Sequence, residues 1–424
     1  MSKTKMNSLP GPEDIHREVL PNGIVVLARP NFNSPSVSIN GYLQTGSLFD
    51  PDDKLGLADF AASALTRGTA NHSFDALYNE LESVGASLGF DSGLHTTSFS
   101  GRALAEDLPL LLGLLSETAR QPVFPDDEVE KLRNQLLTGL AIRMQDTSDM
   151  ADITFDEILY HNHPYSRSED GNPESIKAIT RQDLVDYHYF GFGPRGMVIA
   201  VVGAVEPKEA VRLVHRAVGD WKNPDQRELP QLPEVKLLDE TVKHHYRIAE
   251  KSQADIVIGS NGPRRNDPEY MAASLGNSIL GQFGMMGRVG ESVREKAGLA
   301  YYVYSSLSAG VGPGAWTVSA GVNPSNVKKA GELIVKELKR IVKEAVTEEE
   351  LSDSQANFIG RLPLAFESNS GVAGSLLSIE RYDLGLDYYH RYPDLVRSVT
   401  ASDVLEVARK YIAPDRLAIA TAGP

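Results

Sequence analysis

Two side chains that could act together on a peptide carbonyl lie seven residues apart in the sequence. Arg294 falls in the last turn of a predicted short helix, Met285–Lys296, and Tyr301 opens a predicted strand over residues 301–304. Gly298 lies between them, where a left-handed C-terminal helix cap is expected. A planar guanidinium and a phenol aimed at one point suit a carbonyl or an oxyanion. The spacing therefore predicts a substrate-contact pair.

The alternative interpretation of these two residues is structural. Arg294 would then form an ion pair with Glu291 or Glu295 on its own helix, and Tyr301 would be a half-buried strand residue. This is the commoner situation for an arginine at a helix end, so the sequence around the pair has to decide between the two interpretations.

Residues 294–301 read REKAGLAY. They resemble the R-E-K-x-G-L-A-Y segment of the pitrilysin/insulinase-like zinc peptidases, the group that includes the mitochondrial processing peptidase. In that family the arginine and the tyrosine contact the substrate carbonyl next to the zinc. The resemblance therefore implies catalytic and substrate-binding roles for Arg294 and Tyr301.

The zinc-binding half of the family pattern is not kept. The family carries G-S-x-x-[DE]-P and then G-L-A-H-x-x-E-H, in which two histidines face the metal and the glutamate is the general base. This chain keeps the frame at residues 46–51 and 56–58, but the next five residues are DFAAS. Asp59 replaces the first histidine, Ala62 the glutamate and Ser63 the second histidine.

The third zinc ligand of the family is a glutamate on a later helix, and an accessory glutamate precedes it by two turns. These positions align with Gly139 and Leu132, and a small shift of the alignment brings Glu130 near. One aspartate and one glutamate do not make a three-ligand zinc site with a base. The resemblance thus implies no metal or other cofactor in this chain, with zinc on a partner subunit.

Composition limits the other classes of function. The net charge of 42 − 57 = −15 disfavours nucleic acid and anionic membranes as partners. No apolar run approaches the roughly 18–20 residues that cross a bilayer, and the first residues show no secretory signal. The sequence has no cysteine, which excludes disulfides and thiolate ligands and agrees with a reducing compartment. We therefore expect a cytoplasmic protein without a membrane span.

The chain repeats itself at an offset of about 220 residues. Residues 176–203 and 397–423 each predict a helix, a proline-marked turn and an apolar strand. Thr180 and Thr400 are the expected N-caps of the two helices. Further matched pairs are Asp183 and Asp403, Pro194 and Pro414, Ile199 and Ile419, and Gly203 and Gly423.

This duplication predicts two similar domains, residues 1–218 and 244–424, joined by a proline-containing linker over residues 219–243. In the first, strands at residues 24–27 and 37–43 precede long helices, and a helix with an edge strand closes the domain. This order predicts an α+β fold with two duplicated domains, each a mixed β-sheet with helices packed on one face. The family resemblance covers nearly the whole chain and implies the same fold.

The histidines favour structural roles. His161 and His163 are the densest pair that could bind a metal, with an i,i+2 spacing that would suit a strand or a loop, but no further histidine or cysteine pair lies nearby in the sequence. His188 is expected to pack within a helix. His244 and His245 point to opposite faces of a predicted strand, so they cannot share one ion.

Two further segments could bind ligands. The glycines from 281 to 290 fit neither phosphate-binding motif, and those at 310, 312 and 314 predict a hairpin turn before the strand Trp316–Ala320. Residues 85–104 predict two strands. Residues 96–98 of that pair could add an extended peptide or a neighbouring chain, as the matching sheet edge does in active relatives; the alternative is an ordinary hairpin.

Together these patterns predict the non-metal-binding subunit of a heterodimeric zinc metallopeptidase. A homologous H-x-x-E-H partner would carry zinc and base, and Arg294 and Tyr301 would contact unfolded or short peptides. The chain alone would be inactive and would contribute to metalloendopeptidase activity in the complex. The main alternative is a non-proteolytic structural or assembly subunit resembling the core proteins of the respiratory cytochrome complex. A third is a homodimer that captures peptides without cleaving them.

Overall fold

The computed structural model describes residues 9–282, 284 and 287–424. The chain divides into two compact units, each assembled from three segments of sequence. One change of unit falls between Gln231 and Leu232, inside the predicted linker. The predicted boundaries at residues 218 and 244 stay a prediction. Unit 1 comprises residues up to 140, 168–231 and 363–390, and unit 2 comprises residues 141–167, 232–362 and 391–424.

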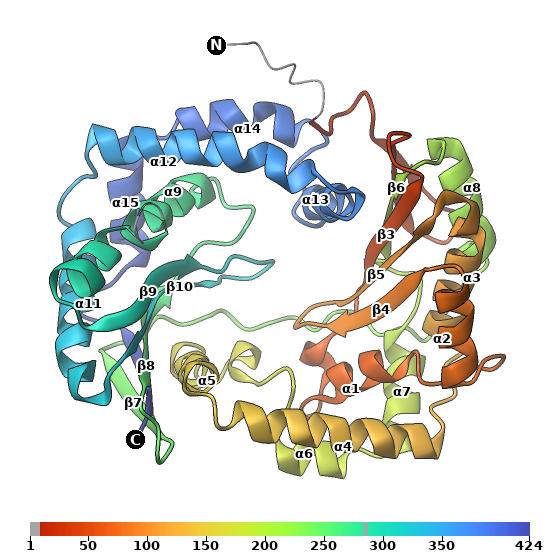
Figure 1. Cartoon of the computed structure of the whole chain (residues 1–424), viewed down its shortest axis with the longest axis horizontal. Helices are drawn as coiled ribbons and strands as arrows, with labels where there is room; N and C mark the ends of the chain where they lie inside the picture. The colour runs from red at the N-terminus through yellow and green to blue at the C-terminus, as the bar shows by residue number, and fades with distance from the viewer. Residues whose placement is uncertain (1–8, 283, 285–286) are drawn as a thin grey trace. The chain divides into compact units, whose positions relative to one another are not determined.

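Unit 1 contains a six-stranded mixed sheet with the strand order β1-β2-β6-β3-β5-β4. Figure 1 labels β3, β4, β5 and β6 of this sheet. Only β2 and β6 run parallel; the other neighbours are antiparallel. The strands are β1 (His16–Val19), β2 (Val25–Pro30), β3 (Ser36–Leu43), β4 (Ser87–Ser92), β5 (Thr97–Leu104) and β6 (Val198–Gly203).

Unit 2 contains a five-stranded sheet with the order β7-β11-β8-β10-β9, again with a single parallel pair, β7 and β11. It matches β2-β6-β3-β5-β4 of unit 1 strand by strand and in every relative direction, so the structure contains the predicted duplication. The strands are β7 (Val242–Arg247), β8 (Ala254–Asn261), β9 (Ala300–Leu307), β10 (Ala315–Val322) and β11 (Ala418–Gly423).

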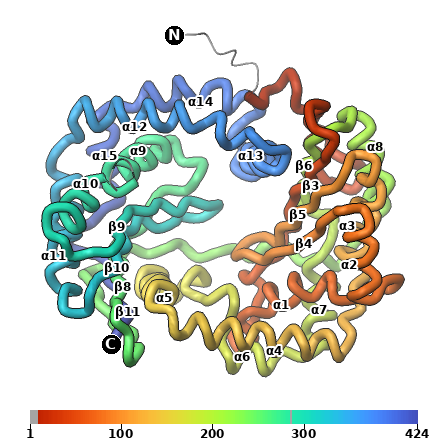
Figure 2. Tube along the Cα trace, in the orientation of Figure 1, coloured from red at the N-terminus to blue at the C-terminus, as the bar shows by residue number. Residues whose placement is uncertain are grey.

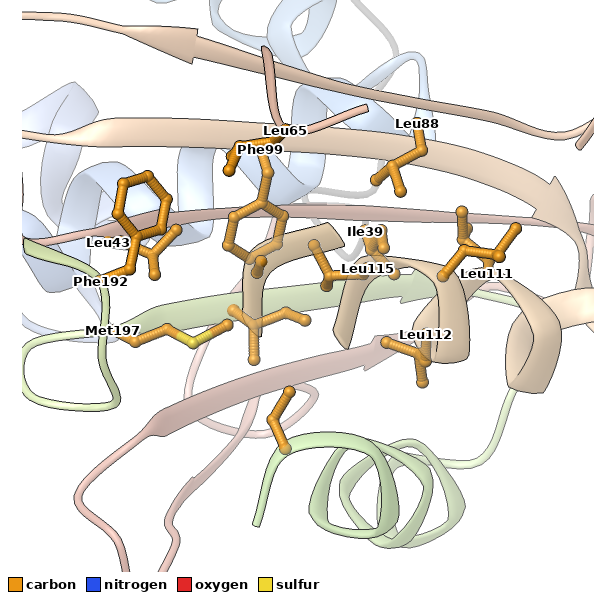
Figure 3. Packing of buried hydrophobic residues seen from close by; sticks show 14 of the residues in the cluster. Ile39, Leu43, Leu65, Leu88, Phe99, Leu111, Leu112, Leu115, Phe192 and Met197 are labelled. Atoms are coloured by element: carbon orange, nitrogen blue, oxygen red, sulfur yellow. The ribbon is translucent and has the colours of Figure 1, made fainter. Parts of the chain in front are cut away.

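Apolar side chains of one sheet face and of the helices above it form the core of unit 1. Leu111 and Leu115 of α3 pack toward Ile39 and Phe99 of the sheet (Figure 3). All four are 2% exposed or less, so burial of this face stabilises the unit by the hydrophobic effect. The helices of this unit outside segment 363–390 are α1 (Leu57–Ala64), α2 (Phe74–Ser83), α3 (Leu108–Arg120), α4 (Asp126–Arg143), α6 (Pro173–Ala178), α7 (Arg181–Gly191) and α8 (Pro207–Val218).

The sheet of unit 2 packs in the same way beneath α9, α11 and α15, around the buried Trp316. The remaining helices are α5 (Thr147–Leu159), α9 (Tyr270–Gly281), α10 (Gly287–Val289), α11 (Val327–Ile341), α12 (Glu348–Arg361), α13 (Asn369–Arg381), α14 (Tyr388–Arg397) and α15 (Ala401–Tyr411).

Two helices belong to the sheet of the opposite half of the sequence. Helix α5 packs in unit 2 on β8 and β11, and α13 packs in unit 1 on β3 and β6. Phe155 of α5 lies in a cluster with Ala418 and Ala420, whereas the intervening Ile419 faces the main core. The α+β fold is therefore confirmed, and each sheet carries one additional helix on its second face.

The two repeats begin their closing helices in the same way. In α7, the hydroxyl of Thr180 accepts the amide of Asp183 and the Asp183 carboxylate accepts the amide of Thr180. Thr400 and Asp403 make the same two bonds in α15. Both predicted N-caps are thus capping boxes, which satisfy amides that the first helical turn leaves unpaired.

We expect Thr180→Ala and Thr400→Ala each to lower the free energy of unfolding by about 1 kcal/mol, because each removes the acceptor of a helix-start amide. The two losses should add, since the sites share no partner. Urea denaturation of the single and double variants measures this. Threonine-to-serine variants, which keep the hydroxyl, are the controls; an equal loss in them would show that the capping oxygen is not the cause.

None of the helices in the described part of the chain combines the length and the apolar character needed to cross a membrane.

Candidate active-site residues

The segment before Arg294 is helical, but it is not a regular α-helix. It consists of α10 (Gly287–Val289) followed by one π-helical stretch, Gly290–Lys296; the predicted start at Met285 lies outside the described residues. Val289 and Val293 are fully buried, as the predicted apolar face requires. Single π-helical turns are rare and occur often at functional sites.

A left-handed glycine ends this helix, as the sequence predicts. Gly298 has φ +62°. Its amide donates to the carbonyl of Arg294 at 3.0 Å, and the amide of Leu299 donates to the carbonyl of Val293 at 3.1 Å. These bonds satisfy helix-end carbonyls and turn the chain into β9, so Arg294 and Tyr301 flank one sharp helix-to-strand junction.

The ion pair that Arg294 forms with a described residue is weak. Its side chain is 34% exposed, and its Nε lies 3.2 Å from Oε1 of Glu295. Glu291 pairs with Lys296 instead. Of the two ion pairs in the structural interpretation, only the one with Glu295 is formed. Partly exposed pairs of this kind contribute at most about 1 kcal/mol, so the guanidinium can exchange this partner for a substrate oxygen.

Tyr301 projects from an irregular point of an edge strand. Strand β9 pairs only with β10 in the sheet order. Tyr302 lies opposite Gly321, and Ala300 lies opposite Val322, so Tyr301 is the extra residue of a β-bulge. Bulges redirect side chains and are frequent next to active sites. Tyr301 is 64% exposed, so the half-buried tyrosine of the structural interpretation is wrong.

A buried carboxylate anchors the strand beside Tyr301. Asp255 on β8 is only 2% exposed. It accepts hydrogen bonds from the hydroxyl of Tyr302, from the hydroxyl of Thr147 at the start of α5, and from Nε2 of Gln253 at 3.0 Å. Burial and the bond to Asp255 raise the pKa of Tyr302, so its phenol stays protonated and keeps donating.

Sequence reasoning missed this support. The signal was an aspartate inside the otherwise apolar strand segment ADIVIGSN, because a buried carboxylate requires hydrogen-bond donors. Two of its donors, Tyr302 and Thr147, lie 47 and 108 residues away along the chain, so the sequence alone did not name them.

Residues 46–51 and 56–58, which match the family pattern around the zinc site, have a structural role in unit 1. The buried carboxylate of Asp50 accepts the amides of Gly56 and Ala58 at 2.9 and 3.0 Å. These amides open α1, and Gly56 has φ +86°. The frame therefore caps the helix that carries positions 59, 62 and 63.

The side chains at the family's zinc positions do not fit a zinc ion. Ala62 is buried and offers no donor, and Gly139 lies exposed on α4 with open space around its missing side chain. Only Asp59 and Ser63 carry oxygen atoms, and zinc sites take three or four nitrogen, sulfur or carboxylate ligands. Within residues 9–282, 284 and 287–424, no three histidine, aspartate or glutamate side chains gather as a metal site.

Glu130, the possible substitute ligand, is turned to solvent. Its side chain is 62% exposed and pairs with Arg133 at 3.0 Å. The guanidinium of Arg133 in turn lies 5.2 Å from the ring centroid of Phe60, the neighbour of Asp59 on α1. A cation at the contact between α1 and α4 is itself unfavourable for a bound Zn²⁺.

Asp59 nevertheless has unusual electrostatics. Burial and the neighbouring carboxylates of Asp170, Asp91 and Glu169 raise its pKa to about 7. Desolvation and like charges both disfavour the ionised form. At neutral pH this aspartate is thus protonated in about half of the molecules, where a catalytic relative would carry a neutral histidine.

We expect Asp59→Asn to raise the free energy of unfolding by about 1–2 kcal/mol at pH 8. The folded pKa lies above the unfolded one, so the wild type loses stability as pH rises from about 4 to about 7, while the asparagine variant does not. Urea denaturation from pH 4 to pH 8 measures the difference, which should vanish near pH 4. A constant difference across this range would contradict the raised pKa.

The predicted peptide-pairing residues in the first sheet were placed on the wrong strand. Residues 97 and 98 belong to β5, whose two sides pair with β3 and β4, and residue 96 precedes the strand. The hairpin itself is present. The edge strand is β4, so Ser87–Ser92 carries the unpaired backbone groups of this sheet edge.

The other excluded sites have the expected structural roles. Nδ1 of His163 accepts the amide of Tyr165, and its Nε2 bonds the carbonyl of Pro233. His188 stacks on Phe192 and bonds the carbonyl of Ala119. The glycines at 310–314 lie in the turn between β9 and β10.

Two family models match this chain. Residues 25–168 match the model of the insulinase family, peptidase family M16, and residues 178–358 match the model of the peptidase M16 inactive domain. An uncharacterized zinc protease of Mycobacterium bovis is 26% identical over 413 residues, 96% of this chain and 93% of that protein. Subunit 1 of the human mitochondrial cytochrome b-c1 complex is 25% identical over 270 residues, 62% of this chain and 55% of that protein.

Solved structures show the same fold. The peptidase M16 inactive domain from Pseudomonas fluorescens has a TM-score of 0.89 and 26% identity, and covers 97% of this chain and 98% of its own. A protease from Helicobacter pylori has a TM-score of 0.90 over 98% of this chain and 100% of its own, at 20% identity, which shows the fold alone. With the REKAGLAY segment at its helix-to-strand junction, this chain belongs to the M16, or insulinase, family of peptidases.

Proposed function

We propose that this chain is the substrate-contact subunit of a two-subunit zinc peptidase of the M16 family. The observation that carries the proposal is the contrast between the two halves of the family pattern, the substrate-contact pair and the zinc site. Arg294 and Tyr301 are kept, accessible and placed at a π-helix and a β-bulge. Asp59, Ala62, Ser63 and Gly139 stand where the family has its metal ligands and base.

In this proposal the chain's own residues bind the substrate. Arg294 gives up its ion pair with Glu295 and donates its planar set of N–H groups to a substrate carbonyl. Tyr301 donates its phenol proton toward the oxygen on which negative charge develops. A homologous H-x-x-E-H partner would bind the zinc that activates water, so the pair would be a heterodimer.

The free edge β4 supports an extended substrate. An unfolded or short peptide could add to Ser87–Ser92 by backbone hydrogen bonds, which folded proteins cannot supply from their interiors. The absence of cysteine agrees with a reducing compartment, and on this ground we propose that the pair works in the cytoplasm.

The test is reconstitution. The chain and an M16 homologue carrying H-x-x-E-H, encoded by a neighbouring open reading frame, are purified separately and mixed with a quenched fluorescent peptide. We expect hydrolysis by the mixture, none by this chain alone, and at most about 0.1 zinc ion per chain by elemental analysis. One tightly bound zinc per chain, or hydrolysis by the chain alone, would overturn the proposal.

A second candidate is a non-proteolytic structural or assembly subunit. The similarity to subunit 1 of the cytochrome b-c1 complex favours it. In that case Arg294 would have no substrate, and replacing it would change no activity of the complex that contains this chain. The activity of Arg294→Ala in the complex therefore separates the two candidates.

A further inference from the structure

An open groove lies on unit 2 between α11 and one face of the sheet. Its volume is about 510 Å³. Ile256, Ile258 and Ile419 line it from β8 and β11, and Val327 and Val335 line it from α11, which runs along β8 (Figure 2). The groove is thus largely apolar and is bounded by two rigid elements.

In unit 1, helix α8 covers the equivalent face of the sheet. Helix α8 follows β6 and packs on β2 and on α3, the counterparts of β7 and α11. Val211 and Val214 of α8 are buried in the core. Ile199 and Val201 of β6 are both 0% exposed in that core. At the offset of 220 residues, their counterparts are Ile419 and Thr421, which are only partly buried.

No helix takes the place of α8 on unit 2 within the part of the chain that the structure describes. The elements in extended contact with β7 are β11 and α5, and α5 lies on the other sheet face with Ala418 and Ala420. The sheet and α11 therefore form an open groove at the position that α8 fills in unit 1.

Basic residues line the rim of this groove. Val26 and Ala28 of β2 are buried and pair with Ile199 and Val201 of β6. In β7 the corresponding positions, paired with Ile419 and Thr421, hold Lys243 and His245, and both are exposed. A lysine and a histidine thus replace two buried apolar residues, so the groove has a different chemistry from the one beneath α8.

Helix α11 adds a third basic group, Lys328, beside a single acidic lining residue, Glu332. Neither Lys243 nor Lys328 belongs to an ion pair with a carboxylate of the described residues. Unpaired cations around an apolar floor are unusual on a chain with a net charge of −15. An occupant with carboxylates along its flanks would complement them.

We propose that this groove binds an acidic amphipathic helix of a partner protein, in the position that α8 takes in unit 1. The apolar stripe of the helix lies on Ile256, Ile258 and Ile419, as helix-in-groove complexes bury spaced apolar anchors. Carboxylates on its flanks face Lys243 and Lys328. Because α8 has 12 residues, we expect the groove to bind a helix of about this length.

The test uses a peptide built on α8. The probe is residues 205–220 of this chain with Lys208, Arg212, His215 and Arg216 replaced by glutamate and with the apolar residues kept. The native-sequence peptide is its matched control. Fluorescence anisotropy should give a Kd of about 10–100 µM for the glutamate peptide. The native-sequence peptide should bind at least about fivefold more weakly, and added salt should reduce this difference.

Gly331→Leu closes the groove without disturbing the fold. A Cβ at Gly331 meets only Cδ1 of Ile258, at 3.8 Å, and leucine is a better helix former than glycine. We expect Gly331→Leu to weaken binding of the glutamate peptide at least about tenfold with an unchanged or higher Tm. Gly360→Leu on α12, where the added side chain meets open space, is the matched control and should bind as the wild type does.

The charges are tested by Lys243→Glu together with Lys328→Glu, which should reverse the preference so that the native-sequence peptide binds better. Equal binding of the glutamate peptide to wild type and to Gly331→Leu would overturn the proposal. Binding of oleate that Gly331→Leu abolishes, with no binding of the peptide, would also overturn it, since the groove would then be a fatty-acid site.

Discussion

Arg294→Ala is expected to lower kcat/KM of the reconstituted peptidase by about 10²–10³. The guanidinium would neutralise charge that develops on the substrate carbonyl in the transition state, and its ion pair with Glu295 is too weak to hold it away. Arg294→Lys keeps the charge but loses the planar set of donors, so its activity should lie between the two. Steady-state hydrolysis of the quenched peptide at saturating partner measures all three proteins.

Controls for this prediction are available on the same helix. Lys296 is 71% exposed and pairs with Glu291, so Lys296→Ala should stay within about twofold of the wild type. Tyr301→Phe removes only the phenol donor and should lower kcat more than it raises KM. Full activity of Arg294→Ala in a mixture that hydrolyses peptides would exclude the substrate-contact role and leave the structural candidate.

Asp255→Ala is expected to lower the free energy of unfolding by about 3 kcal/mol. It leaves the buried donor of Thr147 and the partly buried donors of Tyr302 and Gln253 without their acceptor, and each bond to a charged group contributes about 1.5–3 kcal/mol, though not additively. Asp255→Asn keeps one acceptor oxygen and should lose less. Urea denaturation at pH 7 gives the values.

The matched control for this change is Asp415→Ala. The side chain of Asp415 is 93% exposed and lies 3.9 Å from Lys339, so its loss should change the free energy of unfolding by less than about 0.5 kcal/mol. A loss below about 1 kcal/mol in Asp255→Ala would mean that water replaces the carboxylate, and that this network does not hold β9 beside Tyr301.

The residues that the sequence identified correctly are those governed by short-range rules. Thr180 and Thr400 cap their helices because an amide three residues ahead needs an acceptor. Gly298 adopts the left-handed conformation because glycine lacks the Cβ atom that disfavours a positive φ. The duplication was visible for the same reason, since both copies must solve the same local problems at the same spacing.

Prediction from sequence was wrong where a third segment decides the outcome. Residues 97 and 98 have the composition of an edge, yet β3 pairs with their second side. The alternative interpretation made Tyr301 a half-buried strand residue, but Tyr301 is the extra residue of a bulge in β9 and is exposed. A strand's neighbours depend on contacts far along the chain, and its own residues do not specify them.

What the sequence alone determined is the set of chemical groups: the REKAGLAY pair, the loss of metal ligands at positions 59, 62, 63 and 139, and two copies of one α+β unit. Tertiary structure alone decided that α5 and α13 join the sheets of the opposite halves, that Asp59 has a pKa of about 7, and that unit 2 keeps an open groove where unit 1 holds α8. The physical reason is that side-chain chemistry and helix caps are local properties, whereas burial and electrostatic environment arise only when distant segments pack together.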